Sequence, residues 1–134
     1  MPKHIESKLQ QHCVRWFRYI YPELSPLLFS VPNGGLRGKT EAAIMKGEGL
    51  TEGVSDLLLL VPNRRYHALA IEMKKETFTY EGLKEKRHRS YQRPAQKAWQ
   101  KAVEAQGYRY QIIYNFDEFE KLITDYLRER DDEH

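Results

Sequence analysis

The chain has little cysteine: Cys13 is its only one in 134 residues, which excludes an internal disulfide. No run approaches the ~18 apolar residues of a membrane span, and the N-terminus lacks the apolar segment of a signal peptide. No Cys/His cluster has zinc-site spacing, and no internal repeat, linker or low-complexity segment is present. We therefore expect one domain, residues 1–134, in a reducing compartment such as the cytoplasm, with no membrane partner.

Neither sign of charge dominates, because 22 Lys and Arg stand against 19 Asp and Glu, a net charge of +3. This small excess does not by itself indicate a nucleic-acid partner. Its distribution is more informative, since five basic residues lie close together: Lys84, Lys86, Arg87, Arg89 and Arg93. With the nearby Phe78, Tyr80 and Tyr91, they predict a mobile polar arm over residues 75–93 that contacts phosphates and stacks on unpaired bases. An ordinary solvated loop is the alternative.

A β-hairpin is predicted near the middle of the chain. Two apolar runs, Leu57–Val61 and Tyr66–Ile71, have strand length and flank a short polar segment. If Asp56 faces Glu72 across this hairpin, a three-residue loop remains at Asn63–Arg65, which is a common loop length. A β-bulge would shift this register.

Two acidic side chains and a lysine lie at the open end of this hairpin, and neither apolar run contains Asp, Glu, Lys or Arg. Asp56 enters the first strand, and Glu72 and Lys74 leave the second. Because side chains alternate along a strand, the predicted register places all three on one face. Two carboxylates and one ammonium group at the end of an apolar sheet indicate a functional site. The alternative is a turn residue and a chance Glu-x-Lys, both solvated.

The other patterns alternate helices with strands. We expect a helix over His4–Ile20, a strand over Leu27–Val31, a helix over Glu41–Lys46 capped by Thr40, a helix from Pro94 to Gly107, a strand over Tyr108–Tyr114 and a helix from Asp117. This order of elements is typical of an α/β fold.

Two residues of the first helix lie on its apolar stripe although they carry polar groups. Glu6 falls between Cys13 and Phe17 on that stripe, where a carboxylate is costly unless it is paired or binds a metal ion. A frayed first turn that lets Glu6 reach solvent is the alternative. Cys13 is interpreted as a small core residue, because no nucleophile partner is evident.

The order of Asp56, hairpin and Glu72-x-Lys74 resembles the PD-(D/E)xK nuclease superfamily. Further pieces, in chain order, are similar to its VRR-NUC (virus-type replication–repair nuclease) domain: Val31-Pro-Asn-Gly-Gly35, Glu41–Gly49, Gly53-Val-Ser-Asp56, Ile71-Glu-Met-Lys74, Gln96 with Trp99, and Gly107-Tyr108. They cover nearly the whole chain. The resemblance implies a restriction-endonuclease-like core, in which a small mixed β-sheet is flanked by helices. Two departures are Arg93, where the family often has Ser, and the long segment between Lys74 and Gln96.

The resemblance implies a DNA endonuclease that depends on Mg²⁺ or Mn²⁺. Asp56, Glu72 and the backbone carbonyl of Met73 would hold the metal ion, and Glu6 would complete or orient the site. Such oxygen ligands suit a hard cation that keeps some of its waters.

Two further residues would act on the substrate. Lys74 would position or deprotonate the attacking water and offset developing negative charge, and Gln96 would orient phosphate or water. Candidate DNA-binding residues are Arg37, Lys39, Lys75, Lys84, Lys86, Arg87, Arg89 and Arg93.

The chain looks like the small free-standing members of the family from phages and bacteria. These resemble Holliday-junction resolvases, so branched DNA, a homodimer and the cytoplasm of a bacterial or phage-infected cell are the expected substrate, assembly and location. A flap or single-strand nuclease of the same mechanism, a catalytically idle DNA-binding module and an ordinary α/β interaction domain are the alternatives.

Overall fold

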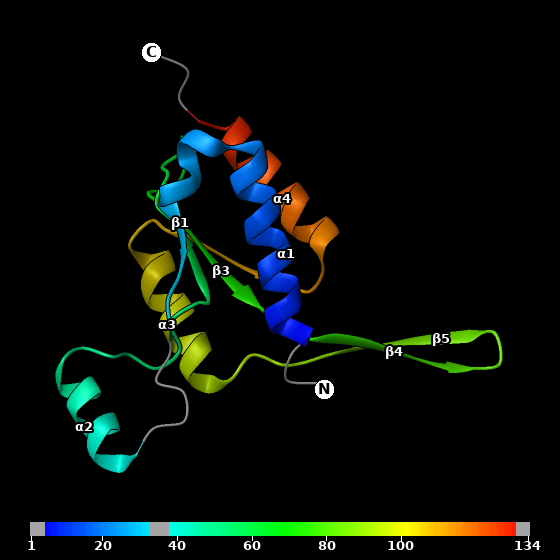
Figure 1. The fold of residues 1–134 in the computed structure, drawn as a ribbon, viewed down its shortest axis with the longest axis horizontal. Coiled ribbons are helices and arrows are strands. Elements are labelled where there is room, and N and C mark those ends of the chain that lie inside the picture. The colour runs from blue at the N-terminus through cyan, green and yellow to red at the C-terminus, as the bar shows by residue number, and fades with distance from the viewer. Residues whose placement is uncertain (1–4, 33–37, 131–134) are drawn as a thin grey trace.

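The computed structural model describes residues 5–32 and 38–130 (Figure 1). Its elements, in order, are α1 Ile5–Ile20, the 3-10 helix η2 Pro22–Leu27, β1 Leu28–Ser30, α2 Lys39–Gly47, β2 Leu57–Leu59, β3 Leu69–Met73, β4 Glu76–Glu81, β5 Lys84–Arg89, α3 Pro94–Ala105, β6 Arg109–Ile113 and α4 Phe116–Arg128. The predicted alternation is confirmed, and η2 and the β4–β5 pair are additions to it. None of the helices in these residues combines the length and apolar character that crossing a membrane requires.

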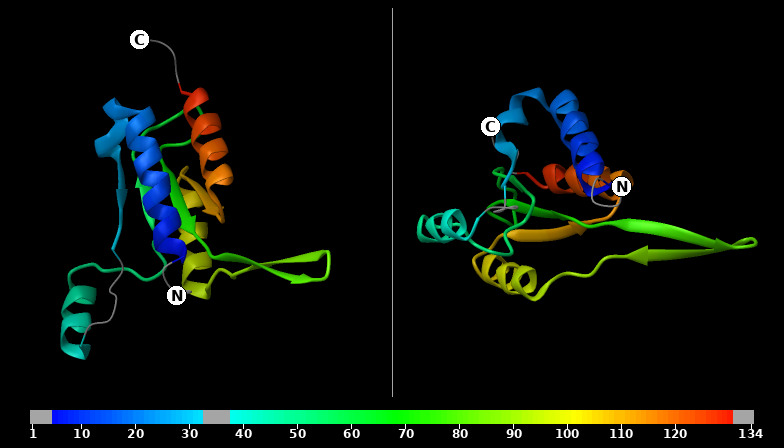
Figure 2. Two further views of the ribbon diagram at one scale, coloured as in Figure 1. Left: turned by 45° about the vertical axis from the view of Figure 1, so that its right-hand side comes forward. Right: turned by 60° about the horizontal axis from the view of Figure 1, so that its bottom comes forward.

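Four strands form one mixed sheet in the order β1-β2-β3-β6. The first three pair antiparallel, and β6 runs parallel to β3. Helices α1 and α4 pack together on one face of this sheet, and α3 lies on the other (Figure 2). Helix α2 stands apart from these layers and has no buried residue. The predicted α/β class, with a small mixed sheet flanked by helices, is confirmed.

The main core lies between the sheet and helices α1 and α4. Cys13 and Phe17 of α1 are fully buried, as predicted, but Ile20 is 46% exposed because it ends the helix where the chain turns away into η2. Burial raises the pKa of the Cys13 thiol to about 12, which keeps it neutral and a poor nucleophile. Five apolar residues of α4, which recur at helical spacing, are buried: Phe119, Leu122, Ile123, Tyr126 and Leu127.

The predicted register of the central hairpin is confirmed. Leu57 pairs with Ile71 across β2 and β3, and the same register places Asp56 opposite Glu72. The short loop predicted at Asn63–Arg65 is wrong, because β2 already ends at Leu59 and β3 begins only at Leu69.

Tertiary hydrogen bonds explain why the two strands separate early. The Tyr126 hydroxyl donates to the Val61 carbonyl at 2.7 Å. The side-chain amide of Asn63 donates to the Tyr126 carbonyl at 3.1 Å. The Val61 carbonyl is therefore satisfied by α4 instead of by a continued ladder between the two strands.

The mobile arm predicted for residues 75–93 is a second hairpin over most of its length. Strands β4 and β5 pair from Glu76 with Arg89 to Glu81 with Lys84, and they project away from the body of the molecule (Figure 1). Gly82 has φ of 65°, as the first central residue of a two-residue type II′ turn requires. The alternating Thr-Phe-Thr-Tyr run was the overlooked strand signal.

Two helices, α2 and α4, begin at other residues than predicted, because other residues occupy their N-cap positions. Helix α2 begins at Lys39 with Gly38 at its N-cap position, so Thr40 lies inside the helix and does not cap it. Helix α4 begins one residue before Asp117, because the side chain of Asn115 accepts a hydrogen bond from the Glu118 N–H at 2.9 Å.

Candidate active site

Four polar side chains converge at the end of β3. Asp56 precedes β2, Glu72 and Lys74 lie at the end of β3, and Gln96 lies in the first turn of α3. Only 3% of Glu72, 7% of Lys74 and 4% of Gln96 is exposed. All four line one cavity of about 740 Å³. The structure therefore brings together the four polar residues that the family resemblance singled out.

The Gln96 side-chain amide connects the other buried groups. Its Oε1 accepts a hydrogen bond from Lys74 Nζ at 2.6 Å and another from the Arg93 backbone N–H at 2.8 Å. Its Nε2 donates to Glu72 Oε2 at 3.0 Å. Lys74 Nζ lies 4.0 Å from the same Glu72 oxygen. Gln96 is thus no ordinary exposed first-turn glutamine, because it is buried and forms hydrogen bonds with both Lys74 and Glu72.

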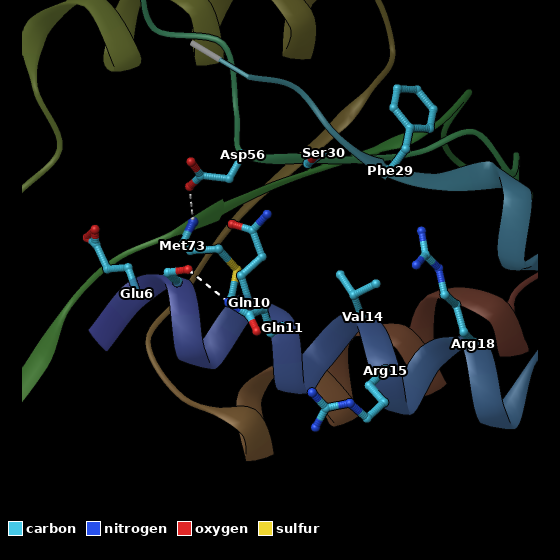
Figure 3. A pocket seen from close by; sticks show the side chains of 11 residues that line it. Glu6, Gln10, Gln11, Val14, Arg15, Arg18, Phe29, Ser30, Asp56 and Met73 are labelled. Atoms are coloured by element: carbon cyan, nitrogen blue, oxygen red, sulfur yellow. Dashed lines mark hydrogen bonds between the residues drawn. The ribbon is translucent and has the colours of Figure 1, made fainter. Parts of the chain in front are cut away.

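The carboxylate of Asp56 is fixed by the backbone of β3. Its Oδ2 accepts a hydrogen bond from the Met73 N–H at 2.7 Å (Figure 3). In an extended strand the N–H and C=O of one residue point to the same side. The Met73 carbonyl therefore faces the Asp56 side of β3, where a backbone ligand to a metal ion would have to lie.

Glu72 is a carboxyl group in an environment that opposes its ionisation. Burial raises its pKa from an ordinary 4.5 to about 8, with Asp56 as the next cause, while the Lys74 ammonium acts in the opposite direction. Among the described residues, Glu72 Oε1 is the buried side-chain oxygen that has no hydrogen-bond partner. Two adjacent carboxylates with one oxygen left unpaired form a site that gains stability from a bound cation.

Glu6 lies close to this pair but does not form a compact cluster with it. It projects from the first turn of α1 beside Asp56 and Met73 (Figure 3) and lines the same cavity. Of the interactions that shift the pKa of Glu72, the one with the Glu6 carboxylate, which raises it, is the smallest. Within residues 5–32 and 38–130, no three His, Cys, Asp or Glu side chains are arranged to hold a metal ion. The groups at this site that could hold a cation are therefore the Asp56–Glu72 pair and the Met73 backbone carbonyl.

Gly53, which the sequence analysis included in a motif without giving it a role, is a structural part of the site. It has φ of 87°, and an added Cβ would collide with the Ala95 carbonyl. The segment before β2 thus packs backbone to backbone against the first turn of α3, which carries Gln96. A glycine three residues before Asp56 was a usable signal for such a close approach.

The candidate DNA-binding residues do not form one surface. Lys84, Lys86 and Arg87 are exposed on the projecting hairpin, Arg93 is exposed at the active-site cavity, and Lys39 is exposed at the start of α2. Lys75 is half-buried at the base of the hairpin. Arg37 lies outside the described residues.

Arg89 has a structural role, which its position among the basic residues between Lys84 and Arg93 did not indicate. Its guanidinium contacts Glu76 and Glu118 at 2.8 Å each and lies 4.2 Å from the centre of the Tyr114 ring. These contacts tie the base of the β4–β5 hairpin to α4. Arg89 is therefore occupied within the chain, in contrast to the exposed Lys84 and Lys86.

Comparison with known proteins identifies the fold. No protein-family model and no curated protein matches this sequence. A solved structure described as a "VRR_NUC domain protein" is similar, with a TM-score of 0.74 and 25% sequence identity over 95% of this chain and 91% of that chain. The similarity extends over nearly all of the chain, as the sequence motifs predicted. The chain therefore has the fold of that VRR_NUC domain protein, which supports a nuclease-type domain.

Proposed function

We propose that this chain is a divalent-metal-dependent DNA endonuclease that hydrolyses phosphodiester bonds at the Asp56–Glu72 site. The observation that carries the proposal is the unpaired, buried Oε1 of Glu72 beside a second carboxylate and a lysine. A buried acidic pair without a cation is unfavourable, whereas the same pair around a cation forms a site for phosphate oxygens.

The residues present fit Mg²⁺ or Mn²⁺. Asp56, Glu72 and the Met73 carbonyl supply oxygen donors, which these hard ions prefer, and they leave positions for water and for substrate phosphate. Glu6 lines the same cavity, where it would orient a water of the ion. When bound, such an ion polarises the phosphoryl group and lowers the pKa of a coordinated water.

The protein side chains position the reaction. Lys74 holds its ammonium group 4.0 Å from Glu72, where it offsets negative charge that develops on the phosphate. Gln96 keeps that ammonium group and the Glu72 carboxylate in place through hydrogen bonds of 2.6 and 3.0 Å. Both polar atoms of the Gln96 side chain take part in these bonds. We therefore assign to Gln96 the role of positioning Lys74 and Glu72. Direct contact with phosphate or water is a secondary role.

The proposed substrate is branched DNA, with a four-way junction as the leading form. A two-fold homodimer would present two equivalent sites to the two strands that a resolvase cuts. The exposed Lys84 and Lys86 on the projecting hairpin would contact DNA phosphates outside the site. A flap or a single strand is the alternative substrate for the same chemistry.

The test compares labelled four-way junction, flap, splayed and duplex DNA with Mg²⁺, Mn²⁺ or EDTA. We expect cleavage that EDTA abolishes and that Asp56→Asn lowers by at least ~10³-fold. The matched control is Asp117→Asn, which removes an exposed carboxylate on α4 and should leave cleavage unchanged. Paired symmetric cuts in the junction would support a resolvase. Preferential cutting of flaps would instead identify a flap, and not the four-way junction, as the substrate.

Direct metal binding separates the nuclease from a catalytically idle DNA-binding module. Calorimetric titration with Mn²⁺ should show binding that Asp56→Asn weakens and Asp117→Asn does not. If the wild-type chain binds DNA in a salt-sensitive way but neither binds Mn²⁺ nor cleaves any substrate, the idle module is the correct reading.

A further inference from the structure

A second cavity continues from the active site along helix α1. It has a volume of about 820 Å³ and lies between α1 and β1 (Figure 3). Glu6, Asp56 and Met73 line both this cavity and the active-site cavity. We call it the α1–β1 groove. Because the two cavities share the metal-site residues, a strand whose phosphate lies at the site can extend directly into the groove.

A cation lies at the far end of the groove. Arg18, in the last turn of α1, lines the groove, and Figure 3 shows its side chain rising from the helix on the groove side. Arg18 is exposed and makes no ion pair with another described residue. Its position near the helix C-terminus is favourable for the helix dipole, but that interaction leaves its hydrogen-bond donors free for a phosphate.

An exposed aromatic ring lies at the same end. Phe29 is the middle residue of β1, the edge strand of the sheet, and 36% of it is exposed although Leu28 beside it is fully buried. It lines the groove together with Arg18. A partly exposed phenyl ring lies here next to a guanidinium group that has no ion-pair partner among the described residues. In proteins that bind single-stranded nucleic acid, aromatic rings stack on bases and cations contact the phosphates.

The length of the groove fits several nucleotides. Arg18 lies about three helical turns from Glu6, which is ~18 Å at 1.5 Å per residue. Stacked nucleotides rise about 3.4 Å each along one strand, so about five of them span this length, and an extended strand needs fewer. In a paired duplex the base faces are covered by stacking on the neighbouring base pairs, so stacking on Phe29 requires an unpaired base.

We propose that the α1–β1 groove binds an unpaired segment of the cleaved strand immediately beside the scissile phosphate, with Phe29 stacking on a base and Arg18 holding a phosphate. This rests on the proposed nuclease function and deepens it, because it requires unpaired nucleotides on one side of the cut. Such nucleotides occur at a flap, a splayed end or a gap beside a branch point, whereas a fully paired four-way junction has none, so binding in the groove favours the flap or single-strand substrate.

The binding test uses metal-free protein in EDTA and single-stranded oligothymidylate with one 2-aminopurine, a fluorescent base. Stacking on Phe29 should quench the fluorescence, and Phe29→Ala should abolish the quenching and weaken affinity about tenfold. Phe29→Trp, which retains a stacking ring, should restore affinity. The control Tyr19→Ala removes an exposed ring that does not line the groove and should have no effect. Equal affinity in Phe29→Ala and Tyr19→Ala would overturn the proposal.

The cleavage test uses duplexes whose cut strand carries an increasing number of unpaired nucleotides on one side, in each polarity. For one polarity, kcat/KM should rise with the unpaired length and then level off once the groove is full. Arg18→Gln should remove most of this rise, whereas Lys8→Gln, an exposed cation of α1 outside the groove, should not.

The two proposals fail in different ways. If no DNA is cleaved with either metal, the proposed nuclease function is wrong. The binding test in EDTA still shows whether the α1–β1 groove binds single-stranded DNA. If duplexes are cleaved as well as substrates with unpaired nucleotides, and Arg18→Gln behaves like Lys8→Gln, the nuclease stands and the groove proposal is wrong.

Discussion

Gln96 Oε1 accepts a 2.6 Å hydrogen bond from Lys74 Nζ, although the two residues are 22 positions apart in the chain. Lys74 follows the buried strand β3, and Gln96 lies in the first turn of α3, which comes after the β4–β5 hairpin in the chain. The bond depends on α3 returning to the end of β3 after β4 and β5 have left the body of the molecule. The position of the Lys74 ammonium group therefore depends on the position of α3.

Replacement of Gln96 by leucine should therefore impair catalysis more than substrate binding. Gln96→Leu leaves Lys74 Nζ, Glu72 Oε2 and the Arg93 N–H without their shared partner. We expect kcat to fall about 10²-fold, with a smaller change in KM. Urea unfolding should show a loss of about 1–3 kcal/mol. Gln106→Leu, at the exposed end of the same helix, is the control; equal kcat values in the two variants would refute the positioning role.

The stability of the metal-free protein should depend on pH through Glu72. Its pKa is raised from 4.5 to about 8 in the folded chain, so between these values the folded chain holds a proton that the unfolded chain has released. Stability is then expected to fall as pH rises through this interval. Urea unfolding in EDTA at pH 5 and at pH 8 measures the effect. Glu72→Gln should flatten the profile, and excess Mn²⁺ should reverse the trend in the wild-type chain.

Alanine at Gly53 should disturb both stability and the site. The substitution strains a backbone with φ of 87° and drives a Cβ into the Ala95 carbonyl. Gly49→Ala is a matched control, because Gly49 has φ of 110° but nothing lies within 4 Å of an added Cβ. Both variants should lose about 1–2 kcal/mol from backbone strain. Only Gly53→Ala should lose more than this and also lower kcat, as measured by urea unfolding and single-turnover cleavage.

Two basic residues of the β4–β5 hairpin should behave differently when replaced. Arg89→Met removes the contacts with Glu76, Glu118 and the Tyr114 ring, so amide exchange should become faster throughout residues 76–89. Lys86→Met should leave exchange unchanged. It should instead weaken DNA binding and reduce the slope of log affinity against log salt by about 1. Identical salt slopes for Lys86→Met and the wild-type chain would remove Lys86 from the DNA contacts.

The sequence by itself determined the pairing at the centre of the site. Two apolar runs bounded by Asp56 and by Glu72 and Lys74 allow few registers, because a shift by one residue would turn every buried leucine of the strand to the other face. The observed pairing of Leu57 with Ile71 follows from that constraint. The apolar stripe of α4 was predictable for the same reason, since burial follows a fixed helical period.

Only the tertiary structure decided how these elements are joined and which polar groups are used. Val61 and Asn63 bond to Tyr126 of α4, so the central hairpin opens earlier than its own residues require. Arg89 looks like its basic neighbours in the sequence, but Glu76 and Glu118 engage it at the base of the hairpin. The burial of Gln96 and the unpaired oxygen of Glu72 arise where β3 and α3 meet. Periodicity fixes which face of an element is buried, but contacts between elements distant in the chain depend on packing that no local pattern encodes.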